Sequence, residues 1–189
     1  MKSTGPEEQF SAGFLRTLSA SGRRLVVRDD PANAVPLAAS WFYAYEFAPF
    51  GDVDAALRRE GSAWTAQAVA IGQPVGDLRG LLNGVIDETP LALLPFVRRN
   101  IPPTLVMIAA RWLPDETCEL LIQPIRSTDW RSAFLEDEDL ATPRVKAAIQ
   151  ATVDAYRTAG RFVKVGRFKK LDPDCPVTYP RATALTGWE

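Results

Sequence analysis

The side chains that most often carry out catalysis near neutral pH are scarce in this sequence. It contains no histidine and only two cysteines, Cys118 and Cys175. Without histidine, Ser-His-Asp and Cys-His nucleophile systems cannot be built, and zinc loses its usual nitrogen ligand. Two cysteines are also too few for a cysteine-only zinc site. Acid–base chemistry would therefore depend on carboxylates, lysine or tyrosine.

The densest group of carboxylates is the run Glu-Asp-Glu-Asp at residues 136–139. Such oxygen ligands suit Mg²⁺ or Ca²⁺, but a calcium loop alternates ligands with spacers and has a glycine at its turn. The run has neither feature, so we interpret it as a solvated linker whose charge favours the start of the next helix. The sequence also lacks the G-x-G-x-x-G, P-loop, G-x-S-x-G and S-x-x-K motifs. We therefore predict no catalytic residue, no metal ligand and no cofactor, and an enzyme is the less favoured alternative.

A dense aromatic group lies between residues 41 and 50. As a strand, this segment would place Trp41, Tyr43, Tyr45 and Phe47 on one face. As a helix, it would align Trp41 and Tyr45 with Leu37. The aromatic density favours a strand over residues 40–48. Its side chains could fill the core, form an interface, or line an apolar pocket in which tyrosine hydroxyls orient a ligand.

A basic segment follows later in the chain, since residues 155–171 contain six cations and no acid. Phe162 and Phe168 lie among these cations, and aromatic stacking combined with phosphate contacts is typical of single-strand nucleic-acid binders. The alternative is an edge strand whose charge prevents edge-to-edge pairing. The net charge of −1 favours this second interpretation, so we expect no nucleic-acid partner.

Three glycines at a spacing of four residues, Gly76, Gly80 and Gly84, share one helical face, the first of them directly before a predicted helix over residues 77–87. A face of this kind lets another backbone pack closely, whereas the alternative is a frayed helix or a loop. The apolar segment 90–97 is interpreted as a wall of the core, with contact to a membrane surface or a partner helix as the alternative.

The elements that would position these residues indicate an α+β fold with a largely antiparallel sheet. The clearest is a β-hairpin over residues 104–125, whose first strand should be central because it is almost continuously apolar. A long helix near 143–159 and shorter helices, one of them over 52–60, should pack on the sheet. Strands are predicted at 23–28 and 161–171, and residues 62–71 could be a strand or a helix.

We predict a single domain over residues 1–171 and an extended, proline-rich tail over 172–189. The tail ends near Trp188, and a tryptophan at a chain end is unusual unless a groove receives it. We therefore expect Trp188 to anchor the tail in a groove of this chain, of a second copy, or of another protein.

The start of the chain lacks the apolar region of a signal peptide, and no uncharged stretch reaches the ~20 residues of a membrane span. We therefore expect a cytoplasmic protein with free thiols. The favoured function is a non-catalytic protein-interaction or assembly module with a protein partner or a second copy. The main alternative is a helix-grip-like cup for a small apolar ligand, ahead of a carboxylate-based enzyme and a single-strand nucleic-acid binder.

Overall fold

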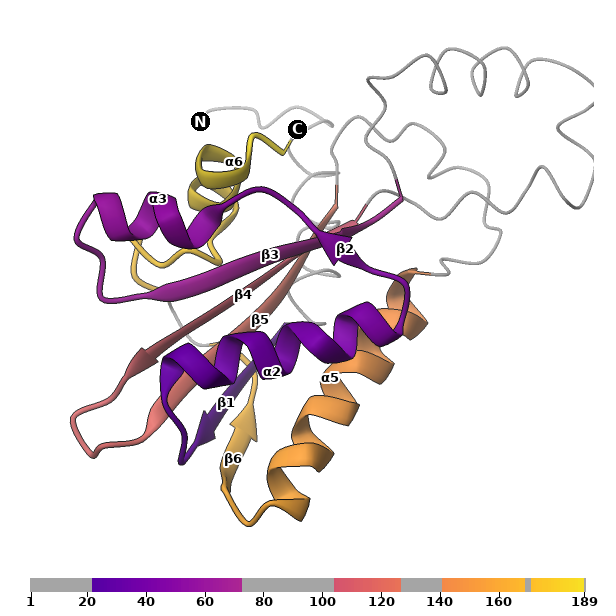
Figure 1. Ribbon diagram of the computed structural model, residues 1–189, viewed down its shortest axis with the longest axis vertical. Helices are drawn as coiled ribbons and strands as arrows, with labels where there is room; N and C mark the ends of the chain where they lie inside the picture. The colour runs from indigo at the N-terminus through magenta and orange to yellow at the C-terminus, as the bar shows by residue number, and fades with distance from the viewer. Residues whose placement is uncertain (1–21, 73–103, 127–140, 169–170, 189) are drawn as a thin grey trace, which may run out of the picture.

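The computed structural model describes residues 22–72, 104–126, 141–168 and 171–188. The described helices and strands are β1 (Arg23–Val27), α2 (Pro31–Ala44), β2 (Ala48–Pro49), α3 (Val53–Arg59), β3 (Thr65–Ile71), β4 (Thr104–Trp112), β5 (Cys118–Arg126), α5 (Ala141–Thr158), β6 (Phe162–Gly166) and α6 (Tyr179–Thr186). The strands form one sheet in the order β2-β3-β4-β5-β1-β6, and every neighbouring pair is antiparallel. Helices lie on both faces of this sheet (Figure 1). The predicted α+β class is confirmed.

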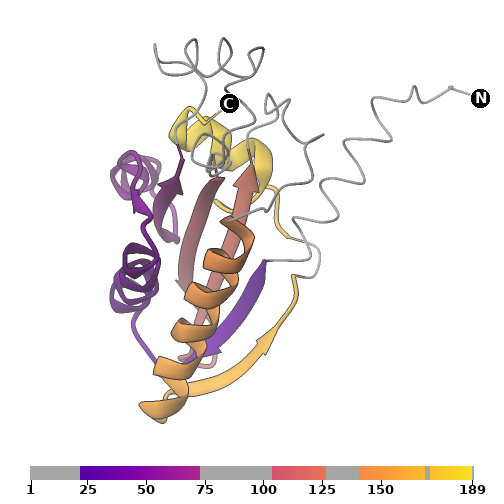
Figure 2. The same cartoon turned by 90° about the vertical axis from the view of Figure 1, so that its right-hand side faces the viewer.

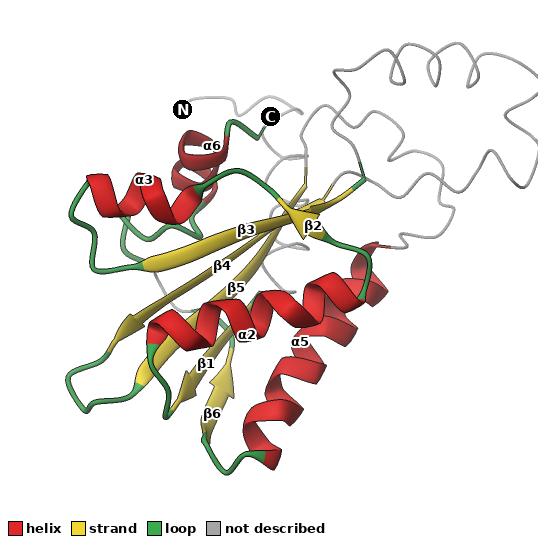
Figure 3. Ribbon diagram, in the orientation of Figure 1, coloured by secondary structure: helices red, strands yellow, loops and turns green. Residues whose placement is uncertain are grey.

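The hairpin of β4 and β5 forms the centre of the sheet, and the central position predicted for its first strand is confirmed. Every residue of β4 from Thr104 to Ala110 is buried, because β3 and β5 flank the strand and both of its faces are covered. The faces alternate: Val106 and Ile108 belong to one core cluster, whereas Met107 belongs to the other. Figure 3 shows the short loop that joins the two strands.

One face of the sheet is covered by α2 and α5, which pack against each other (Figure 2). The stripe predicted for the long helix is confirmed: its buried residues include Val145, Ile149, Val153 and Tyr156. The helix is followed by Gly160, whose φ of 65° is the left-handed conformation that glycine tolerates without strain. The chain then turns directly into β6.

The expected strand over residues 40–48 is wrong, because Ser40–Ala44 is the last part of α2. Asp30 caps this helix, its Oδ1 accepting a hydrogen bond of 2.8 Å from the amide of Ala32, and Pro31 occupies the first turn. The buried positions of the helix recur at helical spacing and end at Phe42, which is fully buried. Packing of this apolar face therefore outweighs the strand preference of the aromatic residues.

The other face is covered by α3, α6 and the segment that leads into α6. The predicted cap of α3 is confirmed, since Asp52 Oδ1 accepts a hydrogen bond of 3.2 Å from the amide of Ala55. The expectation that the tail is extended is wrong for Tyr179–Thr186, which forms α6. Pro180 fits the first turn of a helix, and Gly187 ends it with a φ of 67°.

The segment 62–71, left open by the sequence, contains strand β3. The strand predicted over 161–171 is confirmed for Phe162–Gly166, and the strand predicted over 23–28 is β1. Three other features lie outside the described residues: the glycines Gly76, Gly80 and Gly84, the acidic run 136–139 and the apolar segment 90–97.

Candidate functional site

The aromatic residues selected from the sequence do not share one face, because most belong to α2 and its C-terminal turn. Phe42 and Phe47 are buried and meet edge to face, with ring centroids 5.2 Å apart. Trp41 and Tyr45 are half-buried and pack against the same core, whereas Tyr43 is exposed. These side chains mostly fill the core, and they do not form the continuous surface that a strand would have produced.

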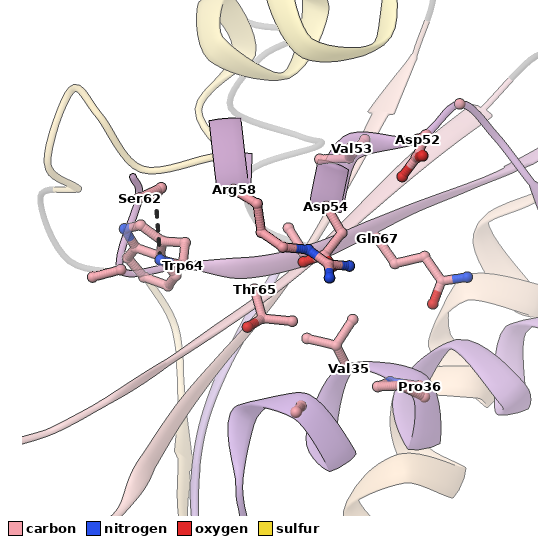
Figure 4. Close-up of a pocket in the computed structure, with 14 residues that line it drawn as sticks. Val35, Pro36, Asp52, Val53, Asp54, Arg58, Ser62, Trp64, Thr65 and Gln67 are labelled. Carbon is pink, nitrogen blue, oxygen red and sulfur yellow. Dashed lines mark hydrogen bonds and ion pairs between the residues drawn. The ribbon is translucent and has the colours of Figure 1, made fainter. Parts of the chain in front are cut away.

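A hollow of about 560 Å³ lies between α2, α3 and β3 (Figure 4). The guanidinium of Arg58 reaches into it from α3, and Thr65 and Gln67 line it from β3. None of the four aromatic residues selected from the sequence, Trp41, Tyr43, Tyr45 and Phe47, lines this hollow. Tyr43 is connected to it indirectly, because its hydroxyl accepts a hydrogen bond from Nε2 of Gln67.

The charged groups of the hollow already have structural partners. Arg58 forms an ion pair with Asp54, four residues earlier on the same helix, and Asp52 caps that helix. Val35 and Trp64 supply apolar walls. The hollow therefore offers a mixed surface with no nucleophile beside a free acid or base, and we assign it no chemistry.

Trp188, selected from the sequence as an anchor, lies against this chain's own sheet. Its ring is 1% exposed and meets Phe50 edge to face, with ring centroids 5.1 Å apart. Cys175 and Val177, on the segment leading into α6, are buried in the same cluster. An ion pair between Arg181 of α6 and Glu60, the residue after α3, joins the two elements. The groove that receives Trp188 therefore belongs to the chain itself.

A buried carboxylate, which the sequence did not single out, lies under this segment. Glu119 is 5% exposed and bonds two arginines from neighbouring strands, Arg24 of β1 and Arg111 of β4, the latter at 2.8 Å. The guanidinium of Arg111 also stacks on Trp64, the residue before β3, 4.4 Å from its ring centroid. Charges on three neighbouring strands, β1, β5 and β4, are thus matched across one face. This row depends on the strand order, which local patterns do not reveal.

The outermost strand β6 carries an apolar and basic edge. Its single strand neighbour in the described sheet is β1, so its other side is an edge (Figure 2). Val163 and Val165 are 41% and 40% exposed, and Lys164 between them is also exposed. Arg167, just after the strand, is exposed as well. Exposed β-branched residues on an open strand edge form a surface for another strand.

A buried carboxylate positions the start of this strand. Asp29 lies 3.6 Å from a guanidinium nitrogen of Arg161, and its Oδ2 accepts a hydrogen bond of 3.2 Å from the hydroxyl of Tyr156. Burial, and then the nearby carboxylate of Asp29, raises the pKa of the Tyr156 hydroxyl. These two contacts connect the C-terminal end of α5, the loop before α2 and Arg161, the residue before β6.

The two thiols are free and lie on opposite faces of the sheet. Cys118 is buried in the core cluster beneath α2 and α5, and Cys175, on the segment leading into α6, is buried in the cluster of the other face. Burial raises the pKa of Cys175 and raises that of Cys118 to about 12, so both thiols are protonated at neutral pH. In the described part of the chain, no three potential metal-ligating side chains come together. None of the described helices has the length and apolar character needed to cross a bilayer.

No protein-family model, curated protein or solved structure matches the chain.

Proposed function

We propose that the protein is a non-catalytic interaction module that binds a partner through the edge strand β6. The observation that carries this proposal is the pair Val163 and Val165, two large apolar side chains that remain about 40% exposed on an open edge. An extended segment added at this edge would satisfy backbone groups and cover both valines, which is the usual mode of strand addition.

The remainder of the described molecule favours binding over catalysis. The carboxylates nearest the hollow, Asp52 and Asp54, serve as a helix cap and an ion-pair partner. The space that a helix-grip cup would leave for a ligand, between the sheet and α5, is occupied by buried side chains such as Leu25, Leu120 and Ile149. Two free, protonated thiols suit a reducing compartment, so we place the module in the cytoplasm.

The proposal is tested by capturing partners from cells of the source organism with the full chain and with Val165→Pro. Proline removes one outward N–H and disturbs an added strand, while an edge strand tolerates it. The matched control is Trp112→Ala, which truncates an exposed apolar side chain three strands away in the sheet. We expect a protein that is recovered with the wild type and with the control but lost with Val165→Pro. Identical recovery with all three chains contradicts the proposal.

A further inference from the structure

The backbone of β6 presents a hydrogen-bonding edge to the outside. The amide of Arg28, just after β1, donates a hydrogen bond of 2.8 Å to the carbonyl of Arg161, so residue 28 faces β6. Along β1, which pairs with β5 in an unbroken register, the direction alternates from residue to residue, so Val26, which is paired with Lys164, also faces β6. The register shift between Val26 and Val27 leaves Val163 of β6 without a partner on β1. The N–H and C=O of Lys164 then point inwards, and those of Val165 point outwards. Val165 thus offers a donor and an acceptor to an added strand.

The side chains of this edge differ between the two faces of the sheet. Val165 is paired with Leu25, whose side chain lies in the core on the α2 and α5 face. Lys164 is paired with Val26, so its side chain projects from the opposite face. A strand laid along β6 would therefore meet an apolar neighbour on one face and a cation on the other. The complementary segment alternates apolar and acidic residues.

The charge of the β6 edge decides whether this edge pairs with a second copy of the chain or with a different protein. Every titratable side chain from residue 161 to residue 167 is basic, namely Arg161, Lys164 and Arg167. Of these, Arg161 lies near Asp29, and Lys164 interacts electrostatically with Asp115 without forming an ion pair. Arg167 has no ion-pair partner among the described residues. Pairing of β6 with the same strand of a second copy would bring like charges together, which destabilises cross-strand pairs. An acidic segment instead gains attraction from the same charges.

We infer that the β6 edge binds an extended acidic segment of a different protein, in which acidic residues alternate with β-branched apolar residues. This inference rests on the proposed function and specifies its partner. The basic charge then has two effects at one edge: it prevents self-association, as edge charges commonly do, and it selects the partner by sign.

The inference is tested with two fluorescein-labelled heptapeptides and the purified full chain. One peptide has the sequence Gly-Glu-Val-Glu-Val-Glu-Gly, and the other replaces each glutamate with lysine. We expect fluorescence anisotropy to show binding of the acidic peptide, at least tenfold tighter than that of the basic peptide, with an affinity that falls as salt rises. Equal binding of both peptides, or no binding of the acidic peptide at millimolar concentration, overturns the inference.

Two variants separate the backbone contribution from the charge. Val165→Pro should weaken binding of the acidic peptide at least tenfold while the thermal melt stays close to that of the wild type. If the melt changes, Val165→Asp replaces it, because an exposed acid repels the peptide without altering the backbone. The double variant Lys164→Glu with Arg167→Glu should reverse the preference, so that the lysine peptide binds more tightly. Unchanged preference in this variant contradicts a charge-selected edge.

The outcomes distinguish the two proposals. If the acidic peptide fails to bind but cellular capture still depends on Val165, the interaction module stands and the acidic class of partner is wrong. If capture is independent of Val165, the proposed function itself is wrong.

Discussion

The ring of Phe168 occupies the space in which a side chain at residue 22 would stand. A Cβ built on Gly22 overlaps this ring and also meets the amide oxygen of Gln123. Phe168 follows β6 and begins the segment that covers the α6 face, whereas Gly22 precedes β1. The missing side chain at Gly22 therefore lets the C-terminal segment lie close to the sheet.

Gly22→Ala should destabilise the protein by about 1–3 kcal/mol, because a methyl group there forces the Phe168 ring out of its site. Urea unfolding followed by circular dichroism measures this loss. The matched control is Gly166→Ala, since a Cβ at Gly166 meets no atom of the described part of the chain within 4 Å. In a Phe168→Ala background, Gly22→Ala should lower the free energy of unfolding much less. An unchanged loss in that background would show that the clash with the Phe168 ring is not the cause of the destabilisation.

Trp188→Ala should lower the free energy of unfolding by about 3–5 kcal/mol, as is usual when a large buried aromatic side chain is removed. Trp188→Phe should cost less, about 1–2 kcal/mol, because it keeps a ring near Phe50 and removes an Nε1–H that has no hydrogen-bond partner among the described residues. Trp112→Ala, at a position 53% exposed, is the control and should change stability little. Equal effects of the changes at Trp188 and Trp112 would contradict the buried position of Trp188.

Glu119→Ala should destabilise the protein by about 1–3 kcal/mol, because it leaves Arg24 and Arg111 facing each other without their carboxylate. The loss stays below that of a fully buried ion pair because the arginines are 30% and 38% exposed. Asp154→Ala removes a carboxylate of similar charge from an exposed ion pair with Arg157 and should cost under about 1 kcal/mol. Chemical denaturation of both variants tests the difference, and a larger loss for Asp154→Ala would be unexpected.

Alkaline pH should destabilise the protein partly through Cys118. Burial raises its pKa in the folded state from 9.0 to about 12, whereas in the unfolded chain the thiol titrates near its ordinary value. Its contribution to stability is therefore complete below pH 9 and is lost as the pH rises from 9 towards 12. Between these pH values, the free energy of unfolding of the wild type should fall by up to about 1.4 kcal/mol per pH unit more than that of Cys118→Ala. Thermal and urea unfolding between pH 8 and 11 test this, and parallel curves for the two proteins would argue against a buried thiol.

Local patterns in the sequence were sufficient to predict the helices and strands whose packing or pairing partners lie nearby in the chain. The hairpin of β4 and β5 follows from two apolar runs around a turn, and α5 follows from an apolar stripe with Gly160 shortly beyond its end. The cap of α3 at Asp52 is equally local. The same reasoning identified Trp188 as an anchor, because a large aromatic residue near a chain end calls for a binding surface.

Tertiary structure determined the conformation and the packing partners of the segments whose local sequence pattern is ambiguous. Residues 40–44 carry a strand-like density of aromatic residues, yet they are helical because Phe42 completes a buried stripe that begins with Pro31. Nothing near Trp188 in the sequence indicates that Phe50, more than a hundred residues earlier, is its neighbour. The row from Trp64 to Arg24 and the open edge at β6 depend on the order of six strands. Contacts between distant parts of the chain set that order. Local propensity does not predict the energies of such contacts.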